Sequence, residues 1–193
     1  MKVLIACEFS GIVREAFRKR GHDAWSCDLL PSEGDNSHHH RGTIELFIHS
    51  DWDLLIAHPP CTYISNAGAR FLYPKGILNP ERLRIGVEAC KLFMKLWNAP
   101  IKSICIENPI PSSVYGLPPY TQIIQPYYFG DPYQKKTCLW LKGLPPLSYI
   151  KPEHKPESTK IPGNWFNKGG KERQKNRSRT FQGIADAMAD QWG

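Results

Sequence analysis

The sequence lacks the features of several protein classes. No apolar run approaches the roughly 18 residues that a membrane helix needs, so no membrane partner is expected. The six cysteines among 193 residues form no C-x-x-C pair, which argues against a disulfide scaffold and against a structural zinc site. Scattered cysteines of this kind fit a reducing compartment, and we expect a cytoplasmic protein. No G-x-G-x-x-G motif is present, so a nicotinamide cofactor is not favoured.

Positive charge is concentrated late in the chain. The formal net charge is +7, and residues 151–180 carry nine Lys or Arg against three Glu. Such a segment is typical of a contact with a polyanion, or of a solvated loop. The run His38-His39-His40 could suggest a metal, but adjacent residues converge poorly on one ion and no nearby group completes a site. We therefore expect DNA or a nucleotide as partner, and no metal.

Short apolar runs alternate with amphipathic segments along the chain. Strands are predicted over 2–7, 22–27, 53–57, 102–106, 122–127 and 137–141, and helices over 12–20, 81–97 and 181–192. The strand predictions rest on short apolar runs bounded by turns, and the helix predictions on apolar stripes of helical spacing. Strands alternating with helices predict an α/β fold, with a mostly parallel sheet covered by helices on both faces. The polar segment 31–42 is predicted to be a loop.

Polar groups follow four of these strands. They are the segment 8–11, Asp28, the segment 58–61 and Glu107-Asn108. Because ligands of such sheets bind beyond the carboxyl ends of the strands, we expect these groups to share one site.

The first of these groups has the form of a cofactor-binding turn. Its residues are Cys7, Glu8, Phe9, Ser10 and Gly11. A glycine between a strand and a helix lets a ligand approach the backbone and meet the helix N-terminus. Asp28, at the end of the next strand, could accept hydrogen bonds from a ribose, or could simply cap the strand end.

The second and third groups carry the chemistry. Pro59 and Pro60 stiffen the chain and would hold the Cys61 thiol rigidly at a strand end, where a thiolate could act as a nucleophile. Glu107 ends a buried strand, and we expect its partial desolvation to raise its pKa, so that it donates a proton near neutrality. Taken alone, each residue could equally be an ordinary loop cysteine or a strand-end cap.

Together these residues resemble the cytosine carbon-5 DNA methyltransferases. That family has a Gly-containing first turn, an acid after the second strand, a Pro-Cys nucleophile and a Glu-Asn acid motif, in this order. Small phage- or prophage-type members that lack a large target-recognition domain are the most similar; they share Phe9-Ser10-Gly11, the segment 58–61, the segment 107–109 and the segment 138–145. The resemblance implies a class I S-adenosylmethionine-dependent methyltransferase fold, which is Rossmann-like.

The resemblance also implies roles for individual residues. Cys61 would attack carbon 6 of cytosine, Glu107 would protonate ring nitrogen 3 with Asn108 beside it, and carbon 5 would then take the methyl group. The cofactor S-adenosylmethionine would be held by the Cys7–Gly11 turn, Asp28 and Pro59. The residues implied in substrate binding are Pro60, Ser65, Gln134, Lys135, Lys136, Arg173 and Arg177.

A division of the chain follows from the same resemblance. Residues 1–145 would form the catalytic core, 146–180 a basic loop that serves as a minimal substrate-recognition insert, and 181–193 the closing helix of the core. If the substrate is duplex DNA, the base must be flipped into the pocket.

Three alternatives stay open on the sequence. The paired prolines also occur in methyltransferases of exocyclic amines, although His58 and Cys61 depart from that motif. A pyrimidine nucleotide or a single strand could be the substrate, since Trp165 and Phe166 lie among basic residues and would suit stacking on exposed bases. A catalytically degenerate protein that binds nucleic acid or a partner is the third.

Overall fold

The computed structural model describes residues 1–156 and 178–193. The strands are β1 (Lys2–Ala6), β2 (Asp23–Asp28), β3 (His39–Arg41), β4 (Leu54–Ala57), β5 (Ser103–Asn108), β6 (Gln122–Ile124) and β7 (Thr137–Lys142). The α-helices are α1 (Ile12–Arg18), α2 (Asn66–Ala69), α3 (Pro80–Trp97) and α5 (Gln182–Trp192). Short 3-10 turns lie at η1 (Ile44–Leu46), η2 (Pro74–Gly76), η3 (Ser113–Tyr115) and η4 (Pro126–Phe129).

All seven strands form one sheet, in the order β3-β2-β1-β4-β5-β7-β6. The first five in this order are parallel, and β7 is antiparallel to both β5 and β6. The prediction of an α/β sheet of the class I methyltransferase type is confirmed. Because the chain builds outward from β1 on one side and resumes at β4 on the other, the carboxyl ends of β1 and β4 flank the switch point where such sheets bind ligands.

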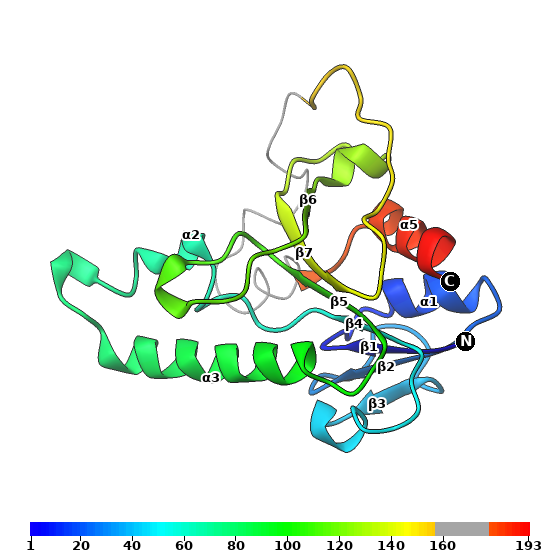
Figure 1. Ribbon diagram of the computed structural model, residues 1–193, viewed down its shortest axis with the longest axis horizontal. Coiled ribbons are helices and arrows are strands. Elements are labelled where there is room, and N and C mark those ends of the chain that lie inside the picture. Colours follow the sequence, from blue (N-terminus) through cyan, green and yellow to red (C-terminus); the bar gives the residue numbers. More distant parts are fainter. Residues whose placement is uncertain (157–177) are drawn as a thin grey trace.

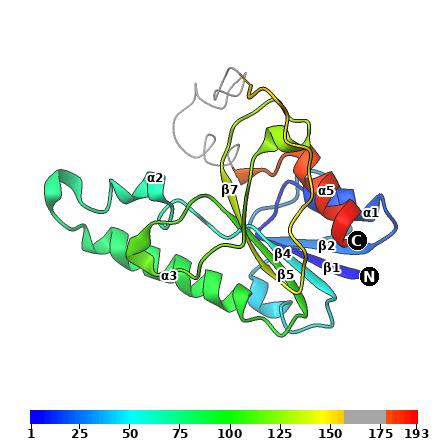
Figure 2. The same cartoon turned by 45° about the horizontal axis from the view of Figure 1, so that its top comes forward.

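Helices cover both faces of the sheet, as predicted. α1 and α5 lie side by side on one face, and α3 runs along the other (Figures 1 and 2). The α1/α5 face buries Val3, Ile5, Leu54 and Ile56 of the central strands under Phe17, Ile184 and Met188. The α3 face buries Leu4, Ala6, Leu55 and Ile104 under Phe93 and Leu96. The central strands are therefore apolar on both faces, which is why they read as continuous apolar runs in the sequence.

The edge strand β3 lies where a loop was predicted. Its side chains are polar, yet His39 Nδ1 lies 2.8 Å from Ser26 Oγ of β2. His40 stacks between Trp25 and Phe47, with ring centroids 4.8 and 4.1 Å away. The histidine run thus packs an edge of the sheet. In the described parts of the chain, no group of three His, Cys, Asp or Glu is placed to hold a metal ion.

A projecting arm follows the Cys61 turn. The arm, residues 62–79, carries α2 and η2 and extends away from the sheet beyond the start of α3 (Figures 1 and 2). Its base is held by Arg82 of α3, whose Nη2 donates to the carbonyls of Thr62 and Gly68 at 3.1 and 3.2 Å. No helix among the described residues is both long and apolar enough to cross a membrane.

Candidate active site

The Cys61 turn and the Glu107 motif lie side by side at the carboxyl edge of the sheet. β4 and β5 are parallel neighbours, with Ala57 opposite Ile106, so His58 and Glu107 are the next pair in register. Beyond the strands, Ser65 forms an antiparallel bridge with Pro111. The amide of Asn66 donates to Ile110 O at 2.8 Å, and that of Ser112 donates to Ile64 O at 2.8 Å. The two motif loops are therefore fixed to each other by backbone hydrogen bonds.

Cys61 lies in a tight turn and is partly exposed. Its carbonyl accepts hydrogen bonds from the amides of Ile64 and Ser65, at 3.2 and 2.9 Å. Pro59 is buried and Pro60 is exposed, so the double proline passes from the core to the surface directly before the thiol. Ser65 is itself buried and belongs to the turn that holds Cys61.

Glu107 is bound to a histidine that the sequence reading did not assign. His58 Nδ1 lies 2.8 Å from Glu107 Oε2, and the two side chains are only 8% and 10% exposed. Thr180, directly ahead of α5, donates from Oγ1 to the same oxygen at 3.3 Å. Within the described part of the chain, the buried His58 Nε2 has no hydrogen-bond partner. A buried polar atom without a partner in a native site is commonly met by water or a ligand.

The expected rise in the pKa of Glu107 was wrong. Burial does raise this pKa, but the hydrogen bond from His58, the charges of His58 and Lys135, and the Thr180 hydroxyl lower it, to about 2. Burial lowers the pKa of His58, while the hydrogen bond and charge of Glu107 and the charge of Glu8 raise it, and the net pKa lies above the usual value. Near neutral pH Glu107 is therefore ionised, and His58 is the group of this pair that holds a proton more readily.

Asn108 faces the other side of the sheet from Glu107. Successive residues of a strand face opposite sides of the sheet. Glu107 is opposite Leu139, which packs on the α1/α5 face, whereas Asn108 is opposite Cys138, which packs on the α3 face. Asn108 is 3% exposed and its Nδ2 has no partner in the described chain. The register of β5 therefore places the side chains of Asn108 and Glu107 on opposite faces of the sheet, and a catalytic role for Asn108 stays a prediction.

The turn between β1 and α1 is closed by its own carboxylate. Glu8 is buried and accepts from the amides of Val13 and Arg14 at 2.7 and 3.3 Å, which occupies the N-terminus of α1. Our expectation that a ligand meets this helix N-terminus is corrected by this contact. Burial raises the pKa of Glu8, while the charge of His58 and the two amides lower it, so that the net pKa lies above the ordinary value. In its ionised form this carboxylate favours a cationic ligand group over a phosphate.

The other residues of the turn are closely packed, and two of them, Cys7 and Gly11, have a left-handed backbone conformation. Gly11 has φ 75°, and a Cβ there would lie 2.7 Å from Nη2 of the buried Arg14. Phe9 is buried, Ser10 Oγ lies 3.4 Å from Glu8 Oε1, and Cys7 has a left-handed φ of 59°. Burial, with the charge of Asp28, raises the pKa of the Cys7 thiol to about 12, so this thiol is not a nucleophile at neutral pH.

Asp28 lies where the sequence placed it, at the carboxyl end of β2. Its Oδ1 accepts from the amide of Leu30 at 2.8 Å, so it caps the strand end. Burial raises the pKa of this carboxyl group. The residue sits beside the Cys7–Gly11 turn, because the amides of Cys7 and Glu8 both donate to Cys27 O, at 2.7 and 3.3 Å.

The basic residues implied in substrate binding are placed in part. Gln134 donates from Nε2 to Pro156 O at 2.8 Å, and Lys136 is exposed. Lys135 lies close enough to Glu107 and His58 to affect both pKa values. It reaches the site because β7 is antiparallel, so that the start of β7 lies at the carboxyl end of β5. Arg173, Arg177, Trp165 and Phe166 lie outside the described residues.

The sequence reading missed His58, Thr180 and the Glu33–Arg179 pair. Arg179 donates to Glu33 from Nε at 2.8 Å and from Nη2 at 2.6 Å, which ties the segment ahead of α5 to the loop after β2. One feature of the sequence could have indicated His58. This residue directly follows a predicted strand, as Glu107 does, so neighbouring parallel strands would bring the two side chains together. Contacts across 122 and 146 positions, as in Thr180–His58 and Arg179–Glu33, give no local pattern in the sequence.

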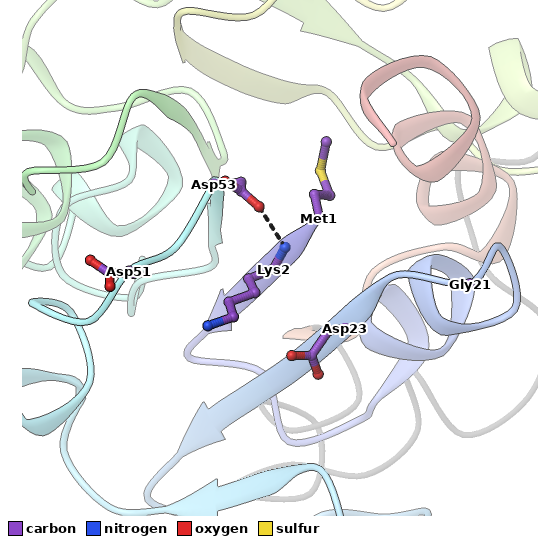
Figure 3. A pocket seen from close by; sticks show the side chains of 6 residues that line it. All are labelled: Met1, Lys2, Gly21, Asp23, Asp51 and Asp53. Atoms are coloured by element: carbon purple, nitrogen blue, oxygen red, sulfur yellow. Dashed lines mark hydrogen bonds between the residues drawn. The ribbon is translucent and has the colours of Figure 1, made fainter.

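One hollow on the surface of the described residues lies away from the candidate site. It encloses about 510 Å³ and is lined by Met1, Lys2, Gly21, Asp23, Asp51 and Asp53 (Figure 3). Lys2 and Asp23 begin β1 and β2, so this hollow lies at the amino edge of the sheet, opposite the candidate site. The amide of Lys2 donates to Asp53 Oδ2 at 2.7 Å, which joins the starts of β1 and β4.

The sheet and the site define an α/β protein of the class I methyltransferase fold, with a cysteine turn and a His–Glu pair beside the switch point. The chain matches no protein-family model and no curated protein. A solved E. coli protein described as a DNA modification methyltransferase encoded within a prophage is 14% identical, with a TM-score of 0.44 over 73% of this chain and 46% of that one. The Entamoeba histolytica methyltransferase EhMeth is 12% identical, with a TM-score of 0.43 over 89% of this chain and 61% of its own. The chain thus spans less than two thirds of either protein, and likeness at this level says nothing of what it binds.

Proposed function

We propose that the protein is a methyltransferase that uses S-adenosylmethionine to methylate carbon 5 of cytosine in DNA, with Cys61 as the nucleophile. The observation that carries the proposal is the pairing of the two motif loops through Ser65 and Pro111, which holds the Cys61 turn against the chain that follows Glu107. A thiol and a carboxyl group fixed in this way suit covalent catalysis on a base held between them.

The residues at the switch point fit the proposed methyl donor. Glu8 places a carboxyl group at the start of α1, which is negative when ionised, and Asp28 lies on the neighbouring strand. S-adenosylmethionine offers a sulfonium, an ammonium and a ribose, and it has no phosphate. The carboxylate that closes the α1 N-terminus therefore favours this donor over a dinucleotide. The donor would supply an electrophilic methyl group; the protein would hold and orient it.

In the proposed reaction the protein supplies the nucleophile and the acid. The Cys61 thiolate forms a bond to carbon 6, the carbon 5–carbon 6 electron pair moves toward carbon 4, and ring nitrogen 3 takes a proton from the Glu107 side. Carbon 5 then accepts the methyl group. A water molecule takes the carbon 5 proton, the carbon 5–carbon 6 double bond forms again, and Cys61 leaves as a thiolate.

A single-stranded substrate is a second candidate, and the arm is the observation that favours it. Phe71 and Tyr73 of the arm are 51% and 49% exposed, and the arm holds Arg70 and Lys75 but no acidic residue. Exposed aromatic rings among basic residues suit stacking on unpaired bases.

The test is transfer of a tritiated methyl group to duplex DNA, single-stranded DNA and dCMP, with digestion of the product to nucleosides. We expect 5-methylcytosine, and a fall in transfer to below about one thousandth in Cys61→Ala. Cys90→Ala is the matched control, because Cys90 is a partly exposed cysteine of α3 that belongs to neither motif. Methylation at the exocyclic amine, or equal activity in Cys61→Ala, would reject the proposal. Binding of DNA without transfer would instead support a degenerate binding protein.

A further inference from the structure

The buried His58–Glu107 pair has a geometry that the resemblance to methyltransferases does not explain. His58 is the residue before the double proline, and it lies beside Glu107 because β4 and β5 are in parallel register. The 2.8 Å contact joins Nδ1 to Oε2, and the Thr180 hydroxyl lies 3.3 Å from the same oxygen. Since His58 and Thr180 both hold Oε2, the second carboxylate oxygen, Oε1, is the one that could meet a ligand.

We propose that His58 is the positioning residue of Glu107 and stores the proton that Glu107 delivers to the substrate base, so that the acid of this site is a buried His–Glu pair. The proposal rests on the function proposed above. It deepens that function by naming the source of the proton that ring nitrogen 3 takes when Cys61 adds to carbon 6.

Several charged groups around His58 favour its protonated form. Glu107 of β5 and Glu8 of the β1–α1 turn favour the charged imidazolium, and Asp28 at the end of β2 is near enough to interact with it. Lys135, ahead of β7, and burial oppose it. Thr180, ahead of α5, is uncharged. Because the pKa of Glu107 is about 2, Glu107 alone has no proton to give at neutral pH, and His58, whose pKa is raised, is the group beside it that can hold one.

The step conserves atoms and charge. When the base covers the site, the proton moves from His58 Nδ1 to the Glu107 carboxyl group, which turns about its Cγ–Cδ bond and presents it to ring nitrogen 3. As the sulfur–carbon 6 bond forms, the electron pair displaced toward nitrogen 3 takes that proton, and His58 is left neutral. Expulsion of Cys61 returns the proton by the same path. No oxidant or further reactant is needed.

The experiment separates the hydrogen bond from the stored proton. Asn at position 58 places a neutral amide donor near the position of Nδ1, so His58→Asn retains a positioning hydrogen bond but has no titratable proton. Single-turnover methyl transfer is measured against pH for the wild type, His58→Asn and His58→Ala. The exposed His49→Asn, on the loop before β4, is the matched control.

We expect the wild-type rate to fall on the alkaline side as His58 gives up its proton. In His58→Asn this fall moves to lower pH by about two units, the difference between ordinary histidine and glutamate pKa values, and the rate above pH 8 drops about a hundredfold. His58→Ala lacks the positioning hydrogen bond as well and is slower at every pH. His49→Asn retains the wild-type profile.

The imidazole ¹⁵N shifts of His58 in the free protein, assigned by their absence in His58→Asn, give a readout that needs no activity. A neutral His58 at pH 7, or an alkaline fall that stays in place in an active His58→Asn, overturns this inference and leaves the proposed function standing. Absence of any Cys61-dependent transfer by the wild type overturns the proposed function, and this inference with it.

Discussion

At the scale of single residues, the main surprise is the charge state of Glu107. The sequence places this acid correctly at the end of a buried strand, and burial alone would raise its pKa. The hydrogen bond and the charge of His58, which follows the neighbouring strand, contribute most to lowering the pKa instead, because they act within a largely dehydrated site. Local sequence reports that a residue will be buried, but it does not report which polar group will be buried against it. That depends on the β4–β5 register, which no short motif encodes.

The same pair makes stability depend on pH in a definite direction. The folded-state pKa of Glu107, about 2, is below its ordinary 4.5, so its contribution is present above pH 4.5 and is lost as pH falls toward 2. The folded-state pKa of His58 is raised above 6.5, so its contribution is present below pH 6.5 and is lost as pH rises through the folded value. The pair therefore stabilises the fold most between about pH 4.5 and 6.5.

Glu107→Gln tests this window. We expect urea unfolding at pH 5.5 to show a loss of about 1–3 kcal/mol relative to the wild type, because a buried imidazolium then lacks its counter-charge. The loss should shrink as the pH rises toward 9 and His58 gives up its proton. A loss that is the same at pH 5.5 and pH 9 would contradict the assignment of the charge to His58. The exposed Glu153→Gln, which makes the same chemical change at the surface, is the matched control.

At the scale of elements, apolar runs and helical stripes were sufficient to predict most strands and helices. α3 begins one residue before the predicted range and ends where predicted, because its apolar stripe is continuous and Asn79 caps its start, accepting from the amide of Arg82 at 3.0 Å. β3 was missed because its residues are His39, His40 and Arg41, which pair with β2 through the backbone and pack through ring stacking. An edge strand of polar residues has no apolar pattern to detect.

The closing helix α5 depends on a close backbone approach. A Cβ on Gly183, in its first turn, would overlap the carbonyl oxygen of Phe129 in η4, and the amide of Gly183 donates to Asp131 Oδ2 at 2.9 Å. Gly183→Ala should therefore cost about 1–3 kcal/mol in urea unfolding, although alanine favours helices in general. The adjacent exposed Gln182→Ala should change stability by less than about 0.5 kcal/mol. Equal effects of the two substitutions would show that the Phe129 backbone gives way without cost.

At the scale of the whole molecule, the sequence predicted that the polar strand ends share one edge, and this follows from the parallel order of β2, β1, β4 and β5. It could not predict that the chain ahead of α5 returns across that edge. Thr180 reaches Glu107 and Arg179 reaches Glu33, so the last described segment joins the β5 end to the loop after β2. Contacts between such distant positions arise only when the whole sheet has formed.

The arm allows a prediction at the same scale. Under the proposed function, its basic residues should bind the nucleic acid backbone, so Arg70→Glu with Lys75→Glu should weaken binding to a single-stranded oligonucleotide. We expect the slope of log affinity against log salt to fall by about 1.4, about 0.7 for each phosphate of a single strand that the variant no longer neutralises. The matched control is Lys19→Glu with Lys102→Glu, two exposed lysines at other places with the same change in charge. An unchanged slope in the arm variant, measured by fluorescence anisotropy, would exclude the arm from the binding surface.

Glu8 has a consequence for how this protein could change over time. One carboxylate both closes the first turn of α1 and lies in the buried cluster around His58. A substitution there cannot alter ligand preference without also loosening a helix that supports the core. A substitution that improved ligand preference would be selected against because it lowers stability, as in the general conflict between activity and stability. Variation in ligand preference should therefore accumulate around Glu8, at Ser10, at Asp28 and in the loop after β2, rather than at Glu8 itself.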